Sequence, residues 1–267
     1  MSFTDYYNHL KENPNNISFW YPKIKDCGIP TPKTYIIDIP EEVLIACFMD
    51  GDQKQNMDIV YNWVKNELMT AIPEDLRGLL FIKNGAFSNK FDFNTACVRY
   101  SSLDIARSII EINYASLMLE TGGNTELAIR ERILNQKEDV PCIYNGMPLR
   151  NEYRVFYNFD TKKALYVVNY WDWDYCYDAI SRNMSDKIIY ESYYGRLKEH
   201  YETNKDKVMQ YVEEHMQTVT GLDGIWSIDI MEANNNLWLI DMALGYRSAY
   251  WDPVKAGLQE EDNGQNK

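Results

Sequence analysis

The chain has 267 residues, of which 45% are hydrophobic and 25% charged, and its formal net charge is −13. Such a composition is ordinary for a globular protein, and the length suffices for two modest domains or two lobes. The acidic balance argues against general nucleic-acid binding, which needs a basic surface. No apolar run approaches the length of a membrane span.

The cysteines and histidines exclude two further classes of site. The five cysteines are widely spaced and form no CxxC pair, so we interpret them as free thiols in a reducing cytoplasm. The three histidines are too far apart for a zinc site of ordinary spacing. The start, MSFTDYYNHLKENPNN, lacks the basic and apolar regions of a signal peptide. We therefore expect a cytoplasmic protein with no membrane or nucleic-acid partner.

The first half of the chain indicates alternating short strands and helices. A loop punctuated by glycine and prolines runs into a short strand over residues 25–38, and helices are expected at 39–48 and 57–69. A buried strand is expected at 78–85. After it come a helix with a Ser101–Asp104 capping box and a stop at Gly122, then a strand at 125–133.

The second half indicates two hairpins separated by a long helix. Two alternating runs surround DTKK within residues 150–172, and a polar segment of helical spacing follows over 185–220. The second hairpin spans 226–242, and the polar tail is expected to be disordered. The order favours an α+β fold with mixed sheets. We expect an N-terminal segment at 1–75, one lobe at 76–128, a second at 129–256 and the tail at 257–267.

The second hairpin carries one aspartate in each apolar strand, Asp229 and Asp241. If Asn234, Asn235 and Asn236 form a three-residue loop, the two aspartates pair on one face with Cβ atoms ~5 Å apart. Opposed like charges destabilise a sheet unless something compensates, and Mg²⁺ favours carboxylate oxygen. A two-residue or four-residue loop would place them on opposite faces. An exposed face with two solvated carboxylates is the alternative.

Cationic residues also recur at strands. Lys83 ends a buried strand, and the following loop runs from Gly85 to Lys90. Such a loop can bring backbone N–H groups to phosphate oxygens, although Lys83 would also fit a strand-end lysine that snorkels to solvent. In RNEYRVF, Glu152 and Arg154 share a face by alternation, which requires either a polar cleft or a solvated outer face.

The order of these signals resembles the ATP-grasp superfamily. The segments GIPTPKTYII, FIKNGAFSNKF, EYRVFY and the pair SIDI and LWLID are similar to a small arginine-using ATP-grasp clade common in phage and bacterial genomes. They also resemble the eukaryotic cell-division-cycle ATP-grasp family, which assists assembly of a translation initiation factor. The resemblance covers roughly residues 28 to 248.

The resemblance implies an α+β ATP-grasp fold whose two lobes hold ATP and Mg²⁺, with the phosphate loop in 76–128 and the metal site in 129–256. It implies an ADP-forming carboxylate–amine ligase that works through an acylphosphate, acting on a small molecule or peptide. The alternative is a nucleotide-binding, assembly or chaperone-like protein with little turnover and a protein partner. A third interpretation, an α+β protein with scattered surface charges, predicts no stabilisation by ATP and Mg²⁺.

The resemblance also implies roles for individual residues. The implied ATP-binding residues are Lys83, Ser88, Lys90, Arg130, Glu131, Glu152 and Arg154. Of these, Lys83 and Arg154 are the implied catalytic residues, on the α- or β-phosphate and the γ-phosphate respectively, with Glu152 orienting Arg154. Asp229 and Asp241 are the implied metal ligands. Many ATP-grasp proteins carry Asn two residues after the last acid, where this chain has Ala243.

Overall fold

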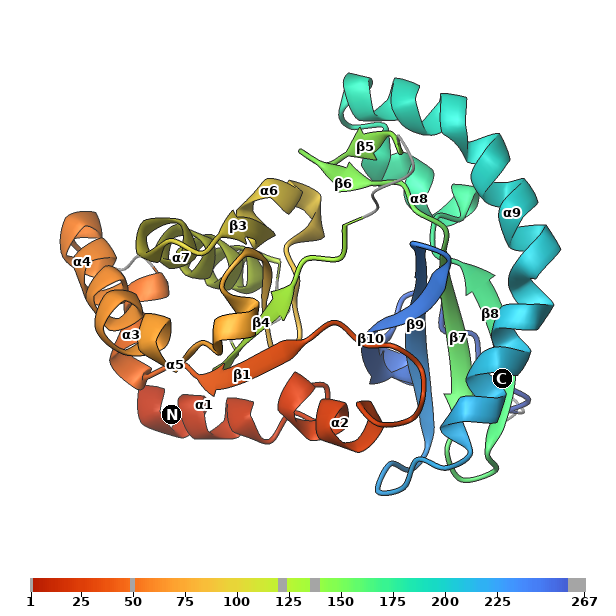
Figure 1. Cartoon of the computed structure of the whole chain (residues 1–267), viewed down its shortest axis with the longest axis horizontal. Helices are drawn as coiled ribbons and strands as arrows, with labels where there is room; N and C mark the ends of the chain where they lie inside the picture. The colour runs from red at the N-terminus through yellow and green to blue at the C-terminus, as the bar shows by residue number, and fades with distance from the viewer. Residues whose placement is uncertain (1, 49–50, 120–123, 135–139, 259–267) are drawn as a thin grey trace, which may run out of the picture. The chain divides into compact units, whose positions relative to one another are not determined.

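A computed structural model describes the chain except for residues 1, 49–50, 120–123, 135–139 and 259–267. The chain divides into two compact units (Figure 1). Unit 1 comprises Met1–Pro22 and Pro32–Pro148, and unit 2 comprises Lys23–Thr31 and Leu149–Lys267. The boundary expected at residue 129 falls inside a strand of unit 1, and the chain passes into unit 2 after Pro148.

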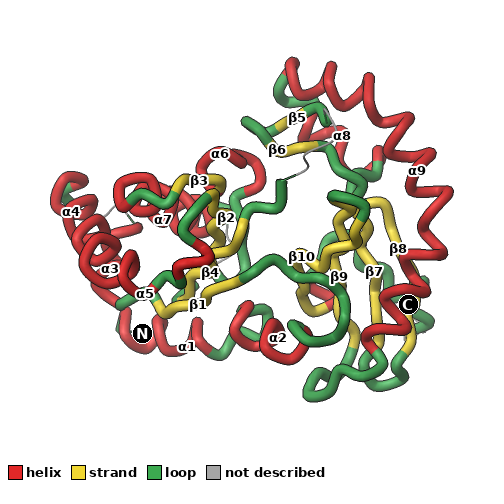
Figure 2. The backbone as a smooth tube through the Cα atoms, viewed as in Figure 1, coloured by secondary structure: helices red, strands yellow, loops and turns green. Residues whose placement is uncertain are grey.

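Unit 1 is built on an antiparallel sheet of order β1-β4-β2-β3, with helices between its strands (Figure 2). Its helices are α1 (Phe3–Lys11), α2 (Ile17–Ile24, which continues into unit 2), α3 (Glu41–Cys47), α4 (Gln53–Trp63), the π-helix η1 (Val64–Leu68), α5 (Met69–Ala71), η2 (Glu74–Leu76), η3 (Lys90–Asp92), α6 (Phe93–Ala96) and α7 (Ser102–Met118). Its strands are β1 (Thr34–Asp38), β2 (Leu79–Asn84), β3 (Cys97–Arg99), β4 (Glu126–Glu131) and a small pair, β5 (Cys142–Ile143) and β6 (Met147–Pro148).

Only one face of the unit 1 sheet belongs to the hydrophobic core. Leu80 and Ile82 of β2 share one face by alternation, and both belong to the same buried cluster as Ile109 of α7. The hydroxyl of Ser101 accepts a hydrogen bond from the Asp104 amide at the start of α7, which is one of the two bonds of the predicted capping box. The other face of the sheet is therefore left to residues with different chemistry.

Unit 2 is built on a second antiparallel sheet, of order β10-β9-β7-β8. Its elements are β7 (Glu152–Asn158), β8 (Lys163–Asn169), α8 (Trp173–Ile180), α9 (Met184–Met216), β9 (Ile225–Ala233), β10 (Asn236–Leu244) and η4 (Gly245–Arg247). The early segment Lys23–Thr31 lies along the edge strand, because the Leu239 amide donates to the Pro30 carbonyl at 2.9 Å.

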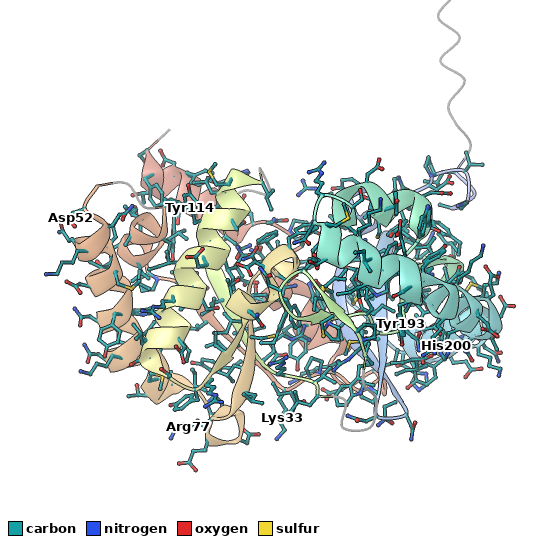
Figure 3. All side chains as sticks on the ribbon, turned by 90° about the horizontal axis from the view of Figure 1, so that it is seen from above. Lys33, Asp52, Arg77, Tyr114, Tyr193 and His200 are labelled. Atoms are coloured by element: carbon teal, nitrogen blue, oxygen red, sulfur yellow. The ribbon has the colours of Figure 1, made fainter. Side chains whose placement is uncertain are left out.

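The long helix α9 covers one face of the unit 2 sheet. The rings of Tyr153 and Tyr201 lie 6.0 Å apart, and the Tyr201 hydroxyl donates to the Val167 carbonyl at 2.9 Å. His200 of α9, labelled in Figure 3, lies 2.7 Å from a carboxylate oxygen of Glu232. Polar contacts thus fix the helix to this face, and the opposite face carries the residues discussed below.

The β9–β10 hairpin differs from the expected loop but keeps the expected pairing. Its turn has two residues, Asn234 and Asn235, because Ala233 pairs with Asn236. The three-residue loop was therefore wrong, and the φ values of 53° and 60° suit the left-handed positions of a type I′ turn. A β-bulge between Leu239 and Asp241 then adds one residue to β10. This extra residue returns Asp241 to the position directly opposite Asp229.

Two expectations lie outside the described residues, namely the helix stop at Gly122 and the tail from residue 259 onward. Within the described residues, no helix is both long and apolar enough to cross a membrane.

Candidate functional site

Unit 1 buries three charged side chains on the sheet face that its core leaves open. Lys83 pairs with Ala128, so by alternation it shares a face with Glu126 and Arg130 of β4. These three residues are only 2–3% exposed. Arg130 Nε donates to Thr34 Oγ1 at 3.0 Å, which connects the row to β1. Lysine, arginine and glutamate side chains are rarely buried to this extent, so this face is a candidate for binding charged groups.

Gly85 lies where two polar side chains approach the backbone. Its amide donates to the Glu126 carbonyl and to Asn124 Oδ1, both at 3.1 Å. A Cβ atom at this position would lie 2.5 Å from Asn124 Oδ1 and from Glu126 Oε1, so glycine is required by this close approach.

The loop after β2 is closed on itself. Asn84 Oδ1 accepts hydrogen bonds from the amides of Ala86 and Phe87, at 3.1 and 2.7 Å. The Gly85 amide is also hydrogen-bonded. Three amides that the sequence suggested as donors to phosphate oxygens therefore donate to groups of unit 1. Ser88 and Lys90 follow as half-buried residues, and Lys90 Nζ lies 5.5 Å from the Phe91 ring centroid.

We did not predict a role for Glu126 from the sequence, although alternation along β4 places it on the same face as Arg130. Its Oε1 accepts a hydrogen bond from the Ser18 amide in the first turn of α2, at 3.1 Å. Burial raises the pKa of the Glu126 carboxyl, and the hydrogen bonds from Ser18 and the Ile17 backbone only partly offset this effect.

The raised pKa gives a testable pH dependence. A carboxyl whose folded-state pKa exceeds its unfolded value stabilises the protein at low pH, and this contribution is lost as pH rises through the folded-state pKa. We therefore expect Glu126→Gln to flatten the fall in stability above pH 4.5, the ordinary value for this group. Urea denaturation of both proteins from pH 4 to pH 8 measures the difference. Parallel pH profiles would contradict the assignment.

Arg130 and Glu131 are separated by the strand. Glu131 points to the opposite face from Arg130, and its Oε1 accepts a hydrogen bond from the Lys33 amide at 2.8 Å. The structure thus brings Arg130 together with Lys83 and places Glu131 apart from them.

Unit 2 holds a buried ion pair on the sheet face opposite α9. Arg154 of β7 pairs with Asp229 of β9, which pairs in turn with Asp241 of β10. Arg154 Nε donates to Asp229 Oδ1 at 2.7 Å and Nη2 donates to Oδ2 at 2.8 Å. The two side chains are 12% and 9% exposed. Glu152 was expected to orient Arg154, but Asp229 makes the hydrogen bonds that do so.

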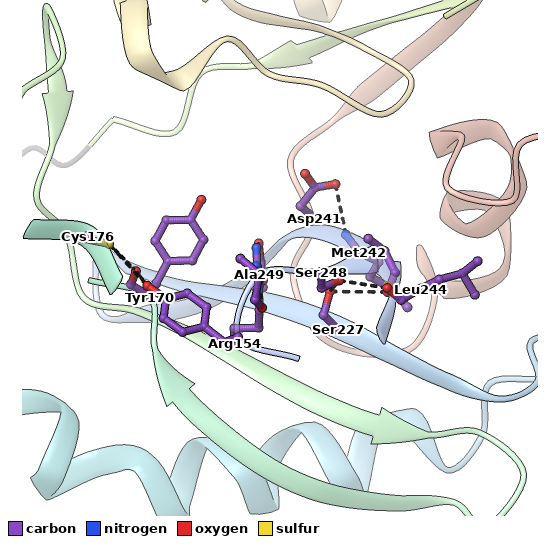
Figure 4. Close-up of polar contacts among 12 residues, drawn as sticks. Arg154, Tyr170, Cys176, Ser227, Asp241, Met242, Leu244, Ser248 and Ala249 are labelled. Atoms are coloured by element: carbon purple, nitrogen blue, oxygen red, sulfur yellow. Dashed lines mark hydrogen bonds and ion pairs between the residues drawn. The ribbon is translucent and has the colours of Figure 1, made fainter. Parts of the chain in front are cut away.

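Further contacts fix the Arg154 guanidinium (Figure 4). Its Nη1 donates to the Ala249 carbonyl at 3.2 Å, and its Cζ lies 5.2 Å from the Tyr170 ring centroid. Burial opposes the charge, but Asp229, with smaller effects from Tyr170 and Asp241, outweighs it and raises the pKa of Arg154. Arg154 is therefore a fixed cation.

The row beside the aspartates contains Ala243, opposite Ser227 of β9. The hydroxyls of Ser227 and Ser248 lie 2.6 Å apart, and Ser248 also donates to the Leu244 carbonyl at 3.0 Å. Neutral hydroxyls thus lie close to Ala243, the position at which the sequence departs from the asparagine implied by the resemblance. Nothing in the sequence pattern indicated that Ser248 returns to this strand.

Two aromatic segments, 170–178 and 245–252, pack on one another. The Tyr250 hydroxyl donates to the Tyr170 carbonyl at 2.7 Å and lies 3.3 Å from Cys176 Sγ. The ring centroids of Tyr175 and Tyr250 are 4.1 Å apart. Tyr250 has a φ of 66°, an unusual value for a bulky residue, so these contacts maintain a strained backbone. The segments therefore support the Arg154 face by packing.

The acidic pair would offer two carboxylates, those of Asp229 and Asp241, to a magnesium ion. Among the described residues no group of three or more His, Cys, Asp or Glu side chains is arranged to hold a metal ion. Mg²⁺ usually keeps several waters and is bound through one or two carboxylates together with substrate phosphates. Asp229 and Asp241 therefore fit an ion that arrives with phosphate, rather than one held by the protein alone.

Comparison with known proteins identifies the fold. No family model matches the chain, and no curated protein matches it. The chain has an α+β fold with antiparallel sheets, and the α+β class is the one that the sequence predicted. Its structure is similar to that of C-terminally truncated Cdc123 from Schizosaccharomyces pombe, with a TM-score of 0.56 and 16% identity over 90% of this chain and 89% of that one.

A second Cdc123 structure from the same organism gives a TM-score of 0.52, with 17% identity over 97% of this chain and 94% of that one. D-alanine–D-alanine ligase from Bacillus anthracis complexed with ATP has a TM-score of 0.35, with 11% identity over 85% of this chain and 52% of that one. That last similarity supports no argument about the site. The Cdc123 structures establish the fold, and the expected resemblance to the cell-division-cycle family is confirmed at that level.

Proposed function

We propose that the chain binds ATP with Mg²⁺ and acts as an ADP-forming carboxylate–amine ligase. The observation that carries the proposal is the arrangement of Arg154, Asp229 and Asp241, three charged side chains in adjacent positions on one sheet face. In unit 1 the buried cations Lys83 and Arg130 support it. Such buried charges stabilise a fold poorly, so their presence in both units is better explained by a charged ligand.

The reaction would proceed in two steps. A carboxylate oxygen of the substrate attacks the γ-phosphorus of ATP, the bond to the β–γ bridging oxygen breaks, and ADP leaves. The resulting acylphosphate is then attacked at its acyl carbon by an amine, which loses a proton as inorganic phosphate leaves. Mg²⁺ bound with ATP would neutralise charge on the phosphate oxygens.

In this scheme the protein supplies mainly positioning and electrostatic stabilisation. Lys83 would hold the α- or β-phosphate, with Ser88 and Lys90 in the adjacent loop, and Arg130 and Glu131 would lie near the adenine and ribose. Arg154 would hold the γ-phosphate, and Asp241 with Asp229 would provide the carboxylates for the metal ion. Glu152 lies on the same sheet face as Arg154.

The test combines binding with trapping of the intermediate. Wild-type protein is expected to be stabilised by ATP and Mg²⁺, and to form ADP together with a hydroxamate when hydroxylamine and a suitable carboxylate are present. Amino acids and dipeptides serve as the first carboxylate panel, with Asp241→Asn as the inactive control. A thermal transition unmoved by ATP and Mg²⁺ would refute nucleotide binding.

A binding protein without turnover is the second candidate function. The observation that favours it is Ala243, because an alanine side chain has no oxygen that could bind a metal ion. The nearby hydroxyls of Ser227 and Ser248 contact each other. In this case nucleotide would stabilise a surface for a protein partner. Tight binding of ATP and Mg²⁺ with no hydroxamate from any member of the panel would favour this candidate over the ligase.

A further inference from the structure

The small β5–β6 hairpin of unit 1 has an unusual turn (Figure 1). Ile143 pairs with Met147, so the turn between the strands consists of residues 144–146. Its members Tyr144, Asn145 and Gly146 all have positive φ, at 48°, 56° and 113°. A positive φ is an outlier for a bulky residue such as tyrosine, and it persists only where the surrounding structure fixes it. Contacts outside the hairpin must therefore hold this turn.

The turn is held by the segment that directly follows the proposed phosphate loop, Gly85 to Lys90. The Phe93 amide donates to the Tyr144 carbonyl at 2.9 Å. Asn145 Nδ2 donates to Asp92 Oδ1 at 3.0 Å, and this bond joins positions 53 apart in the chain. The hairpin is therefore fastened to η3 and α6 both by the backbone and by a side chain.

Gly146 allows the turn to come this close to α6. A Cβ atom at this position would lie 2.7 Å from Asn94 Oδ1, and the φ of 113° is one that other residues rarely adopt. Any larger residue would thus disturb both the turn and its contact with the helix.

Lys90 lies at the start of η3, beside these contacts. Its Nζ is 5.5 Å from the centroid of the Phe91 ring, and that ring meets the Tyr144 ring edge-on, with centroids 5.2 Å apart. On the other side of Lys90, Asn89 has a φ of 45°, and its Nδ2 donates to Thr95 Oγ1 at 2.8 Å. The backbone is therefore fixed on both sides of this lysine.

We infer that the β5–β6 hairpin holds Lys90 in position for a phosphate oxygen of the nucleotide, and that Asn145 is the positioning residue that fastens the hairpin to Asp92. This inference rests on the proposed nucleotide binding, in which Lys90 belongs to the phosphate loop, and refines it. A cation that is already in place binds more tightly than one that must be ordered during binding. The rival role is a hairpin that only stabilises unit 1.

Exchanging two side chains tests the fastening bond. Asn145→Asp keeps a residue that tolerates positive φ, but it places a second carboxylate against Asp92. Adding Asp92→Asn restores the bond with donor and acceptor exchanged. Hydrogen exchange of the Phe93 amide is followed by NMR in the full-length chain without nucleotide. We expect faster exchange in Asn145→Asp and the wild-type rate in the double variant, and equal rates in all three proteins would overturn the inference.

Calorimetric titration with ATP and Mg²⁺ tests whether the hairpin acts through Lys90. Weakening the fastened state by one hydrogen bond lowers the affinity roughly three- to tenfold. We expect this loss in Asn145→Asp, and recovery when Asp92→Asn is added. In a Lys90→Met background the loss caused by Asn145→Asp should disappear, because the cation that the hairpin positions is gone. A loss of the same size with and without Lys90, or no loss at all, contradicts the positioning role.

Asn145→Gly guards against a folding defect. It deletes the side-chain bond to Asp92, accepts the positive φ and adds no charge. If Asn145→Asp does not fold, a loss of affinity in Asn145→Gly that depends on Lys90 supports the inference, and an unchanged affinity overturns it. Wild-type protein that binds no ATP would refute the proposed function and with it the role of Lys90, whereas the exchange experiment succeeds or fails without nucleotide.

Discussion

Arg154→Met is expected to lower the free energy of unfolding by about 3–5 kcal/mol, and Asp229→Leu to lower it by a similar amount. Each change leaves one charge of the pair buried without its partner, and the two side chains are only 12% and 9% exposed. Arg154→Met also removes the cation that is hydrogen-bonded to Asp229, which lies directly opposite the like-charged Asp241. The double variant removes both charges from the pair, so its loss should be much smaller than the sum of the single losses.

Urea denaturation of the four proteins provides the double-mutant cycle. Lys187→Ala is the matched control, because Lys187 forms an ion pair with Glu191 in the same unit, at 3.9 Å with side chains 31% and 41% exposed. A change below about 1 kcal/mol is expected there. Additive losses at Arg154 and Asp229 would show that the two charges do not stabilise each other.

Alternation along β7 was enough to predict which of its charged side chains share a face. It placed Glu152 and Arg154 together, and in the structure both lie on the face that carries Asp229. A pattern within one strand does not specify the partner strand, so Glu152 was assigned to Arg154 although the neighbouring strand supplies Asp229. Local sequence also indicated both hairpins and the Ser101 cap, since these depend on residues close in the chain.

The register of the acidic hairpin shows why the rest was beyond sequence reasoning. The asparagine turn alone would separate Asp229 from Asp241, and the β-bulge after Leu239 reverses that effect. The Leu239 amide bonds to the Pro30 carbonyl, a group more than two hundred positions earlier in the chain. Glu126 was missed for a similar reason, because its partner Ser18 lies in a distant helix.

Lys83→Met is expected to abolish most of the stabilisation that ATP and Mg²⁺ give to the wild-type chain. Ligand at a hundredfold excess over Kd stabilises a protein by about 2.7 kcal/mol. Loss of a charged hydrogen bond to phosphate, worth about 1.5–3 kcal/mol, would reduce this to about 0.3–1.3 kcal/mol at the same ligand concentration. Methionine retains an unbranched side chain, so the sheet around Lys83 keeps its packing.

The matched control is Lys33→Met, which removes the same charge from the same unit. Lys33 is an exposed residue, labelled in Figure 3, whose Nζ lies 2.8 Å from Asp75. Its ligand-induced stabilisation should equal that of wild type, because a surface ion pair contributes little and carries no phosphate. Equal stabilisation of the Lys83 and Lys33 variants would remove Lys83 from the nucleotide site. A selective loss at Lys83 would explain why the chain keeps a lysine in a position that is only 2% exposed.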